Sequence, residues 1–161
     1  MPTVITATID PAGGRVDART SRSQPIMMDV DPPEGGDTAA GPKEVLLASL
    51  AGCTAIDVAS ILRKKRQMPT SYEIEVSGES AEEHPRVFTR ITVEHRVRGD
   101  VAAEALRRSI ELSATRYCPV SAMLSAAVRI EHRYRLTDAT GVELVATVAI
   151  TGPEGPVRTT A

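Results

Sequence analysis

The strongest constraint on this chain's fold is an apolar segment, residues 45–62, in which Asp57 is the only charged residue. Gly41-Pro42 opens it, and proline suits a first helical turn because its missing N–H is not needed there. A helix this apolar either crosses a membrane or lies in a protein core. The segment is at the short limit for a span, and Asp57 at mid-membrane would cost about 2.5–3.5 kcal/mol. We therefore predict a buried core helix and no membrane association.

The rest of the chain carries the patterns of an α+β protein with antiparallel strands. Alternating apolar and polar residues predict β-strands, and two further stretches with a helical apolar stripe predict helices, the first capped by Asp100. A segment dense in turn formers predicts a mobile loop. The expected strands are 3–9, 15–20, 26–29, 72–78, 87–98 and 129–136, the expected helices are 101–116 and 120–127, and the expected loop is 31–37.

The 161 residues are enough for one domain with a real core. We assign residues 1–140 to that domain and residues 141–161 to a C-terminal extension. The extension begins with an apolar stretch to Ile150 that predicts an added strand. It then continues through two Gly-Pro pairs, which predict a disordered tail.

Composition and charge indicate which binding partners and which cellular location to expect. The net charge of −2 gives no overall attraction to nucleic acid, and the basic run 63–66 fits the end of the apolar helix, where cations complement the helix dipole. The amino terminus lacks the pattern of a signal peptide, so we expect a soluble cytoplasmic protein. Aromatic residues make up only 2% of the chain. A core without large side chains buries less area, which favours oligomerisation.

The residues best suited to chemistry are two cysteines, Cys53 and Cys118. Cytosolic cysteines stay reduced, so these are either inert core thiols or redox-active ones. The chain has no CxxC, and His84, His95 and His132 are isolated in sequence, so no zinc or other metal site is predicted.

The sequence predicts different surroundings for the two thiols. Cys53 lies mid-helix among apolar neighbours, which raises a thiol pKa, so a reactive thiolate there needs a nearby cation. Cys118 precedes Pro119 at a helix break, where the next helix's amino end favours a thiolate.

Two motifs around these cysteines resemble the OsmC/Ohr family. One is GPKEVLLASLAGCTAIDV (41–58), which resembles the family's central helix, and the other is RYCPVSAML (116–124), which resembles its second-cysteine motif. The likeness runs from about residue 3 to 136 and is greatest to the YhfA-like branch, through GCTAIDV (52–58) and PRVFT (85–89). Residues 142–161 lie outside it.

The resemblance implies an intertwined homodimer in which curved antiparallel sheets pack on long central helices. It also implies a cofactor-independent thiol peroxidase for small organic hydroperoxides. Cys53 would become a sulfenic acid, Cys118 would condense with it to a disulfide, and a cellular dithiol would reduce that disulfide.

The family's peroxidases add an arginine from the amino-terminal hairpin and a glutamate on the first turn of the cysteine helix. Arg15 matches the arginine best, with Arg19 and Arg22 as alternatives. The glutamate position holds Lys43, and Glu44 follows one place later, about 100° around the helix. The alternative is therefore a non-enzymatic dimer that binds a small lipophilic ligand or senses redox state, with structural cysteines.

Overall fold

The computed structural model describes residues 2–159, which form two compact units. The first extends to Ala48 and the second begins at Ser49. Helix α1, Pro42–Lys64, starts in the first unit and continues into the second.

The first unit is a three-stranded antiparallel sheet. Its strands are β1 (Ile5–Ile9), β2 (Val16–Thr20) and β3 (Pro25–Met28), in the order β1-β2-β3. The β1–β2 hairpin turns at Asp10, whose carboxylate accepts the Ala12 N–H at 2.9 Å, and Gly14 adopts a left-handed φ of 70°. The strands expected near residues 3–9, 15–20 and 26–29 are therefore present.

The turn-rich segment 31–37 is a loop, as predicted, and a carboxylate binds the residues on either side of it; its mobility stays a prediction. Asp29, only 2% exposed, accepts hydrogen bonds from the Val30 N–H at 2.8 Å and the Thr38 N–H at 2.9 Å. The Thr38 hydroxyl donates a third bond at 2.6 Å. These bonds, the Thr38 hydroxyl first, lower the pKa of Asp29 well below its usual range. Turn formers indicate a loop, but they do not reveal the buried acceptor that flanks it.

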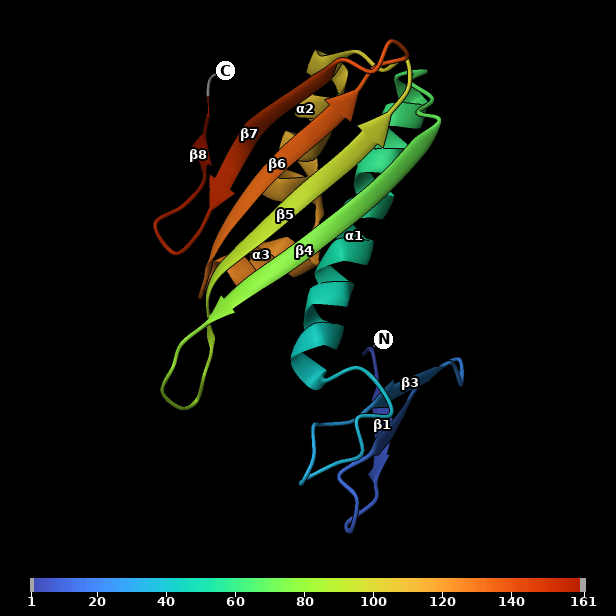
Figure 1. The fold of residues 1–161 in the computed structure, drawn as a ribbon, viewed down its shortest axis with the longest axis vertical. Helices are drawn as coiled ribbons and strands as arrows, with labels where there is room; N and C mark the ends of the chain where they lie inside the picture. The colour runs from blue at the N-terminus through green and yellow to red at the C-terminus, as the bar shows by residue number, and fades with distance from the viewer. Residues whose placement is uncertain (1, 160–161) are drawn as a thin grey trace. The chain divides into compact units, whose positions relative to one another are not determined.

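The second unit is a five-stranded sheet with its helices on one face (Figure 1). The sheet order is β4-β5-β6-β7-β8, with β5 and β6 parallel and the other pairs antiparallel. Parallel neighbours need a long crossover, and here it is helical. The strands are β4 (Ser71–Ser80), β5 (Phe88–Arg98), β6 (Arg129–Thr137), β7 (Glu143–Thr151) and β8 (Val157–Arg158); the crossover contains α2 (Ala103–Leu112), the π-helix η1 (Ser113–Tyr117) and α3 (Pro119–Ser125).

The core lies between these helices and the inner face of the sheet. Val58 and Leu62 of α1 pack there with Leu106 and Ile110 of α2 and with residues of β5, β6 and β7. Helix α1 buries one ridge with a spacing of four residues: Leu50, Thr54, Val58 and Leu62.

Within the chain, α1 is not buried on all sides as we predicted. Ile56, on another face of the helix, is 72% exposed. One layer of helices on one sheet face can cover a helix on one side only. By length and composition alone α1 could also span a membrane, a test that core helices of soluble proteins pass as well.

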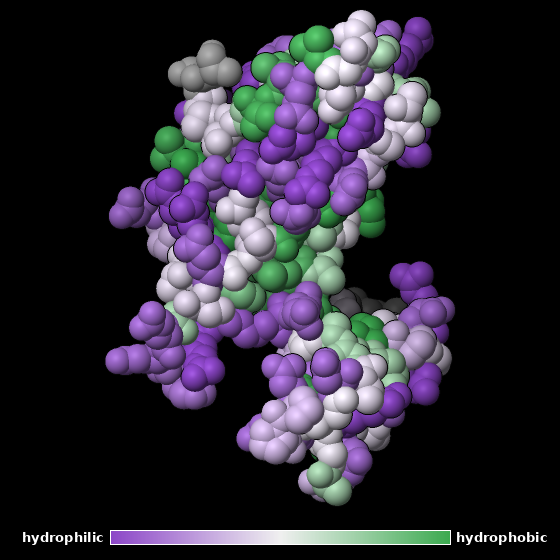
Figure 2. All heavy atoms as spheres, in the orientation of Figure 1, coloured by the Kyte–Doolittle hydropathy of each residue, from purple (hydrophilic) through white to green (hydrophobic). Residues whose placement is uncertain are grey.

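The outer face of the sheet carries charged side chains, and Figure 2 shows hydrophilic residues gathered over it. At their centre, the Glu94 side chain is only 4% exposed and pairs with Arg96 at 2.9 Å and with Arg133 at 2.8 Å. The alternating pattern places Glu94 on the wet face, but its arginine partners cover it.

The start of α2 and the C-terminal extension both differ from prediction. The N-cap of α2 is Ala102, not Asp100, and its N–H donates to the Gln67 side chain at 2.7 Å. The strand expected at 141–150 corresponds to β7. The tail was expected to be disordered from 151, but the chain turns back and Val157 pairs with Ile150 of β7. Residues 160 and 161 lie outside the described part.

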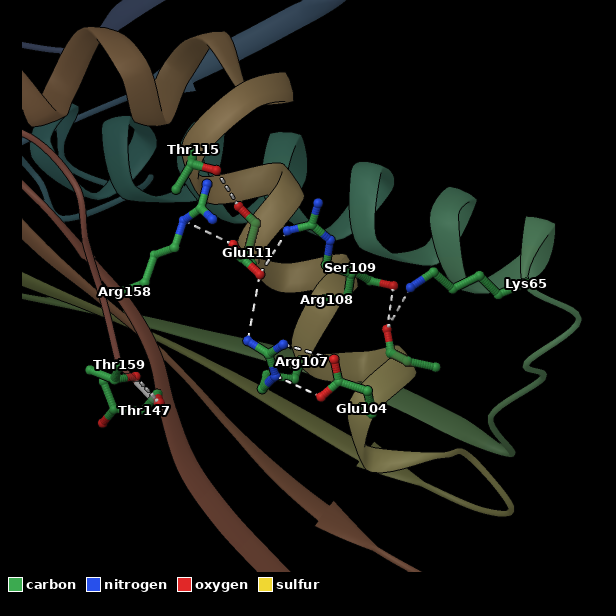
Figure 3. Close-up of polar contacts among 11 residues, drawn as sticks. Lys65, Glu104, Arg107, Arg108, Ser109, Glu111, Thr115, Thr147, Arg158 and Thr159 are labelled. Carbon is green, nitrogen blue, oxygen red and sulfur yellow. Dashed lines mark hydrogen bonds and ion pairs between the residues drawn. The ribbon is translucent and has the colours of Figure 1, made fainter. Parts of the chain in front are cut away.

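The extension is tied to α2 through Glu111 (Figure 3). The Glu111 side chain is 3% exposed and pairs with Arg108 at 2.9 Å and Arg158 at 3.0 Å, with Arg107 at 3.5 Å. Burial raises the pKa of Glu111, but the arginines, Arg108 first, lower it more, so the net shift is downward. A carboxyl with a lowered pKa stabilises the fold above its unfolded pKa and loses that contribution as the pH falls.

We therefore expect Glu111→Gln to lower the free energy of unfolding by about 1–2 kcal/mol at pH 7, because three partly exposed arginines lose a buried charged partner. The difference from wild type should shrink as the pH falls below 4.5, the usual pKa of the group. Urea unfolding at several pH values measures it. Glu104→Gln, at a side chain 73% exposed, is the control and should cost less than about 1 kcal/mol. Equal effects of the two variants would contradict the role of Glu111.

Candidate functional site

Helix α1 places two chemically active side chains on neighbouring turns of one face. Cys53 and Asp57 are four residues apart, and this spacing puts side chains one above the other. Both are partly buried and flank the fully buried Thr54 and Val58 of the α1 ridge. Packing of the ridge against the core thus fixes where the Cys53 thiol and the Asp57 carboxylate lie.

Cys118 is positioned by a change of helix type. The π-helix η1 ends at Tyr117, and Cys118 is the extended N-cap of α3, followed by Pro119. Its Sγ accepts the Ser121 N–H at 3.3 Å and the Thr54 hydroxyl at 3.6 Å. Cys118 is only 2% exposed. The sequence predicted the helix break and the amino end of the next helix beside Cys118. No sequence pattern predicted the π-helix.

These elements bring Cys53, Cys118 and Asp57 together. The two sulfurs and a carboxylate oxygen all lie within 4.8 Å of one another. The Ser113 hydroxyl donates a hydrogen bond to Oδ2 of Asp57 at 3.1 Å and orients the carboxylate. The site therefore combines two thiols and a carboxylate from α1 and from the η1–α3 junction.

The electrostatics of the cluster favour a protonated Cys53. Burial, the hydrogen bond with Cys118 and the Asp57 charge all raise the pKa of Cys53, and a hydrogen bond from the Val120 backbone lowers it, with a net value of about 11. None of these contributions comes from a cation. Burial also lowers the pKa of His95 to about 3 and of His132 to about 4, so both histidines are neutral.

The other predicted site residues belong to the first unit. Arg15, Arg19 and Arg22 have exposed side chains on or beside the β1–β3 sheet, and Lys43 and Glu44 lie exposed in the first turn of α1. The Glu44 carboxylate accepts the Gly41 N–H at 2.7 Å, as the acidic residue of a capping box does. Glu44 therefore caps α1, and its pairing with an arginine remains a prediction.

Three residues of the site were missed from sequence: Asp57, Thr54 and Ser113. Asp57 had a signal, since it is the only charge in residues 45–62, but we used it only as an argument against a membrane span. Thr54 and Ser113 have no such signal, because small hydroxyl residues are common on buried helices.

A comparison with protein families matches residues 35–133 to the family described as OsmC-like protein. The chain belongs to the OsmC family. Protein YhfA of Escherichia coli strain K12 is 43% identical to this OsmC-family chain over 115 residues, which cover 71% of the chain and 84% of YhfA. The family resemblance drawn from the two cysteine motifs is thereby confirmed.

Solved structures support the same fold. A hypothetical protein from Aquifex aeolicus VF5 has a TM-score of 0.75 and 25% identity, covering 86% of this chain and 98% of that one. The organic hydroperoxide resistance protein OhrB of Bacillus subtilis has a TM-score of 0.61 and 16% identity, covering 83% and 98%. The predicted OsmC-like α+β fold is therefore confirmed.

The geometry of the cluster predicts that Asp57→Asn lowers the pKa of Cys53, because it removes a negative charge that disfavours the thiolate. The measurement is the rate of Cys53 alkylation by iodoacetamide against pH, with chelator present and labelling located by mass spectrometry. Asp100→Asn, an exposed change outside the cluster, should leave the profile unchanged. An unchanged or raised pKa in Asp57→Asn would contradict the arrangement.

Proposed function

We propose that this OsmC-family protein is a thiol-dependent peroxidase that reduces organic hydroperoxides, with Cys53 as the attacking thiol and Cys118 as the resolving thiol. The observation that carries the proposal is the approach of the two sulfurs to within 4.8 Å, from segments 65 residues apart in the chain. The names of structural relatives, such as the organic hydroperoxide resistance protein OhrB of Bacillus subtilis, support the same activity.

The proposed cycle is balanced with respect to electrons and protons. The Cys53 thiolate attacks the distal peroxide oxygen, the O–O bond breaks, and the alkoxide takes a proton and leaves as the alcohol. Cys118 then attacks the sulfenic sulfur, which releases water and forms the Cys53–Cys118 disulfide. A cellular dithiol returns two electrons and two protons by thiol–disulfide exchange and restores both thiols.

Exposure supports this division of roles. Cys53 is partly exposed, so a peroxide can reach it, and Cys118 is almost completely buried. Cys118 also accepts two hydrogen bonds, from Thr54 and Ser121, which hold its sulfur in position to attack the sulfenic acid.

The substrate is proposed to be organic because apolar side chains are exposed on both elements that carry the cysteines. Ile56 of α1 is 72% exposed and Met123 of α3 is 67% exposed. Each methylene of an alkyl chain that they bury contributes about 0.8 kcal/mol. Hydrogen peroxide gains nothing from such a surface.

Catalysis at neutral pH needs a cation. With its pKa raised to about 11, Cys53 is almost entirely a neutral thiol at pH 7. We propose that Arg15 supplies the charge, with Arg19 and Arg22 as alternatives, and that Glu44 orients the guanidinium. Arginine suits this role because it stays charged at physiological pH.

The protein is further proposed to be a cytoplasmic homodimer. The face of α1 that carries Leu46, which the chain leaves exposed, supports association. Obligate interfaces typically bury roughly 2,000 Å² or more, and such an area would cover this face.

A second candidate function is a non-enzymatic dimer that binds a small lipophilic ligand or senses redox state. The raised pKa of Cys53 favours it, as does Lys43 at the position where the family's peroxidases have glutamate. Its cysteines would be structural or would respond slowly to oxidants.

The peroxidase proposal predicts that Cys53→Ser abolishes turnover of cumene hydroperoxide, while Cys118→Ser still forms one sulfenic acid per chain. Dimedone labelling and mass spectrometry locate that sulfenic acid, because dimedone reacts with it specifically. Label on Cys118 in Cys53→Ser, and none on Cys53 in Cys118→Ser, would reverse the roles. Absence of turnover and label in the wild-type protein would favour the second function.

The cation proposal predicts that Arg15→Ala raises the pKa of Cys53 in the alkylation assay, because a positive charge near a thiol favours its ionised form. Arg19→Ala and Arg22→Ala are matched controls from the same unit. A rise in only one of the controls would assign the role to that arginine. If none of the three variants raises the pKa, the hairpin supplies no activating cation.

A further inference from the structure

We propose that the reduced protein binds a thiophilic divalent metal ion, with Zn²⁺ as the reference ion, through Cys53 Sγ, Cys118 Sγ and a carboxylate oxygen of Asp57. The three ligand atoms lie within 4.8 Å of one another. The site goes beyond the proposed peroxidase, because it needs no peroxide, and it uses Asp57, to which the peroxidase cycle assigns no role.

The donor set selects the class of ion. Two sulfurs and one carboxylate oxygen suit Zn²⁺, whereas Mg²⁺ and Ca²⁺ prefer oxygen alone. Zinc–sulfur bonds of about 2.3 Å in a tetrahedron place two sulfurs about 3.8 Å apart. The ligand atoms therefore need to approach one another by about 1 Å to reach metal-bound distances.

Each ligand is already oriented by an outer hydrogen bond. Cys53 accepts a hydrogen bond from the Val120 backbone, and Cys118 accepts those from Thr54 and Ser121. The Ser113 hydroxyl binds Oδ2 of Asp57 and leaves Oδ1 for the metal. Outer partners of this kind fix ligand orientation, and their loss typically weakens metal binding 10–100-fold.

The charge balance of the cluster also favours a cation. Two thiolates and a carboxylate carry three negative charges at one partly buried place. A divalent ion that binds there would displace the thiol protons and offset the charge. Three protein ligands leave a fourth tetrahedral position for water or a small thiol. Cys53, which is partly exposed, lies on the side open to solvent.

The experiment titrates the reduced, chelator-treated full chain with Zn²⁺ against a chromophoric chelator, with no peroxide present. We expect about one Zn²⁺ per chain, and binding at least about tenfold weaker in Asp57→Asn and in Ser113→Ala. Asp100→Asn and His84→Ala change exposed residues outside the cluster and should bind as wild type does. Cobalt(II) in place of Zn²⁺ should give a near-ultraviolet thiolate-to-metal absorption band, which reports sulfur ligation without any substitution.

Three results would overturn the proposal: no binding by the wild-type protein, unchanged affinity in Asp57→Asn, or undiminished binding after both cysteines are alkylated. The alkylated wild-type chain avoids a cysteine variant that fails to fold. Because the titration involves no turnover, a failure of metal binding and a failure of the peroxidase proposal give separate results.

Discussion

Packing of one ridge of α1 against the core of the second unit governs the rest of the site. Leu50, Thr54, Val58 and Leu62 repeat every four residues, so they form one buried line along the helix. Burying that line fixes the rotation of α1 about its axis. The residues that flank it, Cys53 and Asp57, consequently face the η1–α3 junction, where Thr54 reaches Cys118 by a hydrogen bond. A rotation of α1 by a single residue, about 100°, would separate the three groups.

The same packing makes the Cys53 thiolate electrostatically unfavourable. Burial and the Asp57 charge both disfavour the Cys53 thiolate, and the neutral histidines of the sheet do not offset them. A positive charge from outside the cluster would stabilise the thiolate, and it could come from either of two sources. An arginine beside Cys53 would activate the thiol for attack on a peroxide. A bound metal ion would instead hold both sulfurs and withdraw them from that reaction.

Elsewhere among the described residues of the second unit, carboxylates are buried where several arginines converge. Glu94 on the outer sheet face and Glu111 on α2 are both nearly inaccessible, and each has three arginines within ion-pair distance. Arg158 comes from the C-terminal extension, so the pairing at Glu111 joins β8 to a helix that the family match contains. Among the residues that the structure describes, no arginine contributes to the pKa shift of Cys53, and this contrast sets the thiol site apart from the structural ion pairs.

By itself, the sequence determined the helices and strands apart from η1 and β8, the α+β class and the family. Periodicity, turn chemistry and capping are local properties, and the GCTAIDV and RYCPV motifs each identify one cysteine. The tertiary structure alone decided that Asp57 and Ser113 join these cysteines, that a π-helix precedes Cys118, and that Glu94 and Glu111 are buried. It also decided that residues 157–158 pair as a strand. The physical reason is that these contacts depend on the rotation of α1 and on the path of the β5–β6 crossover. Both are set by packing between residues distant in the chain, which no local pattern encodes.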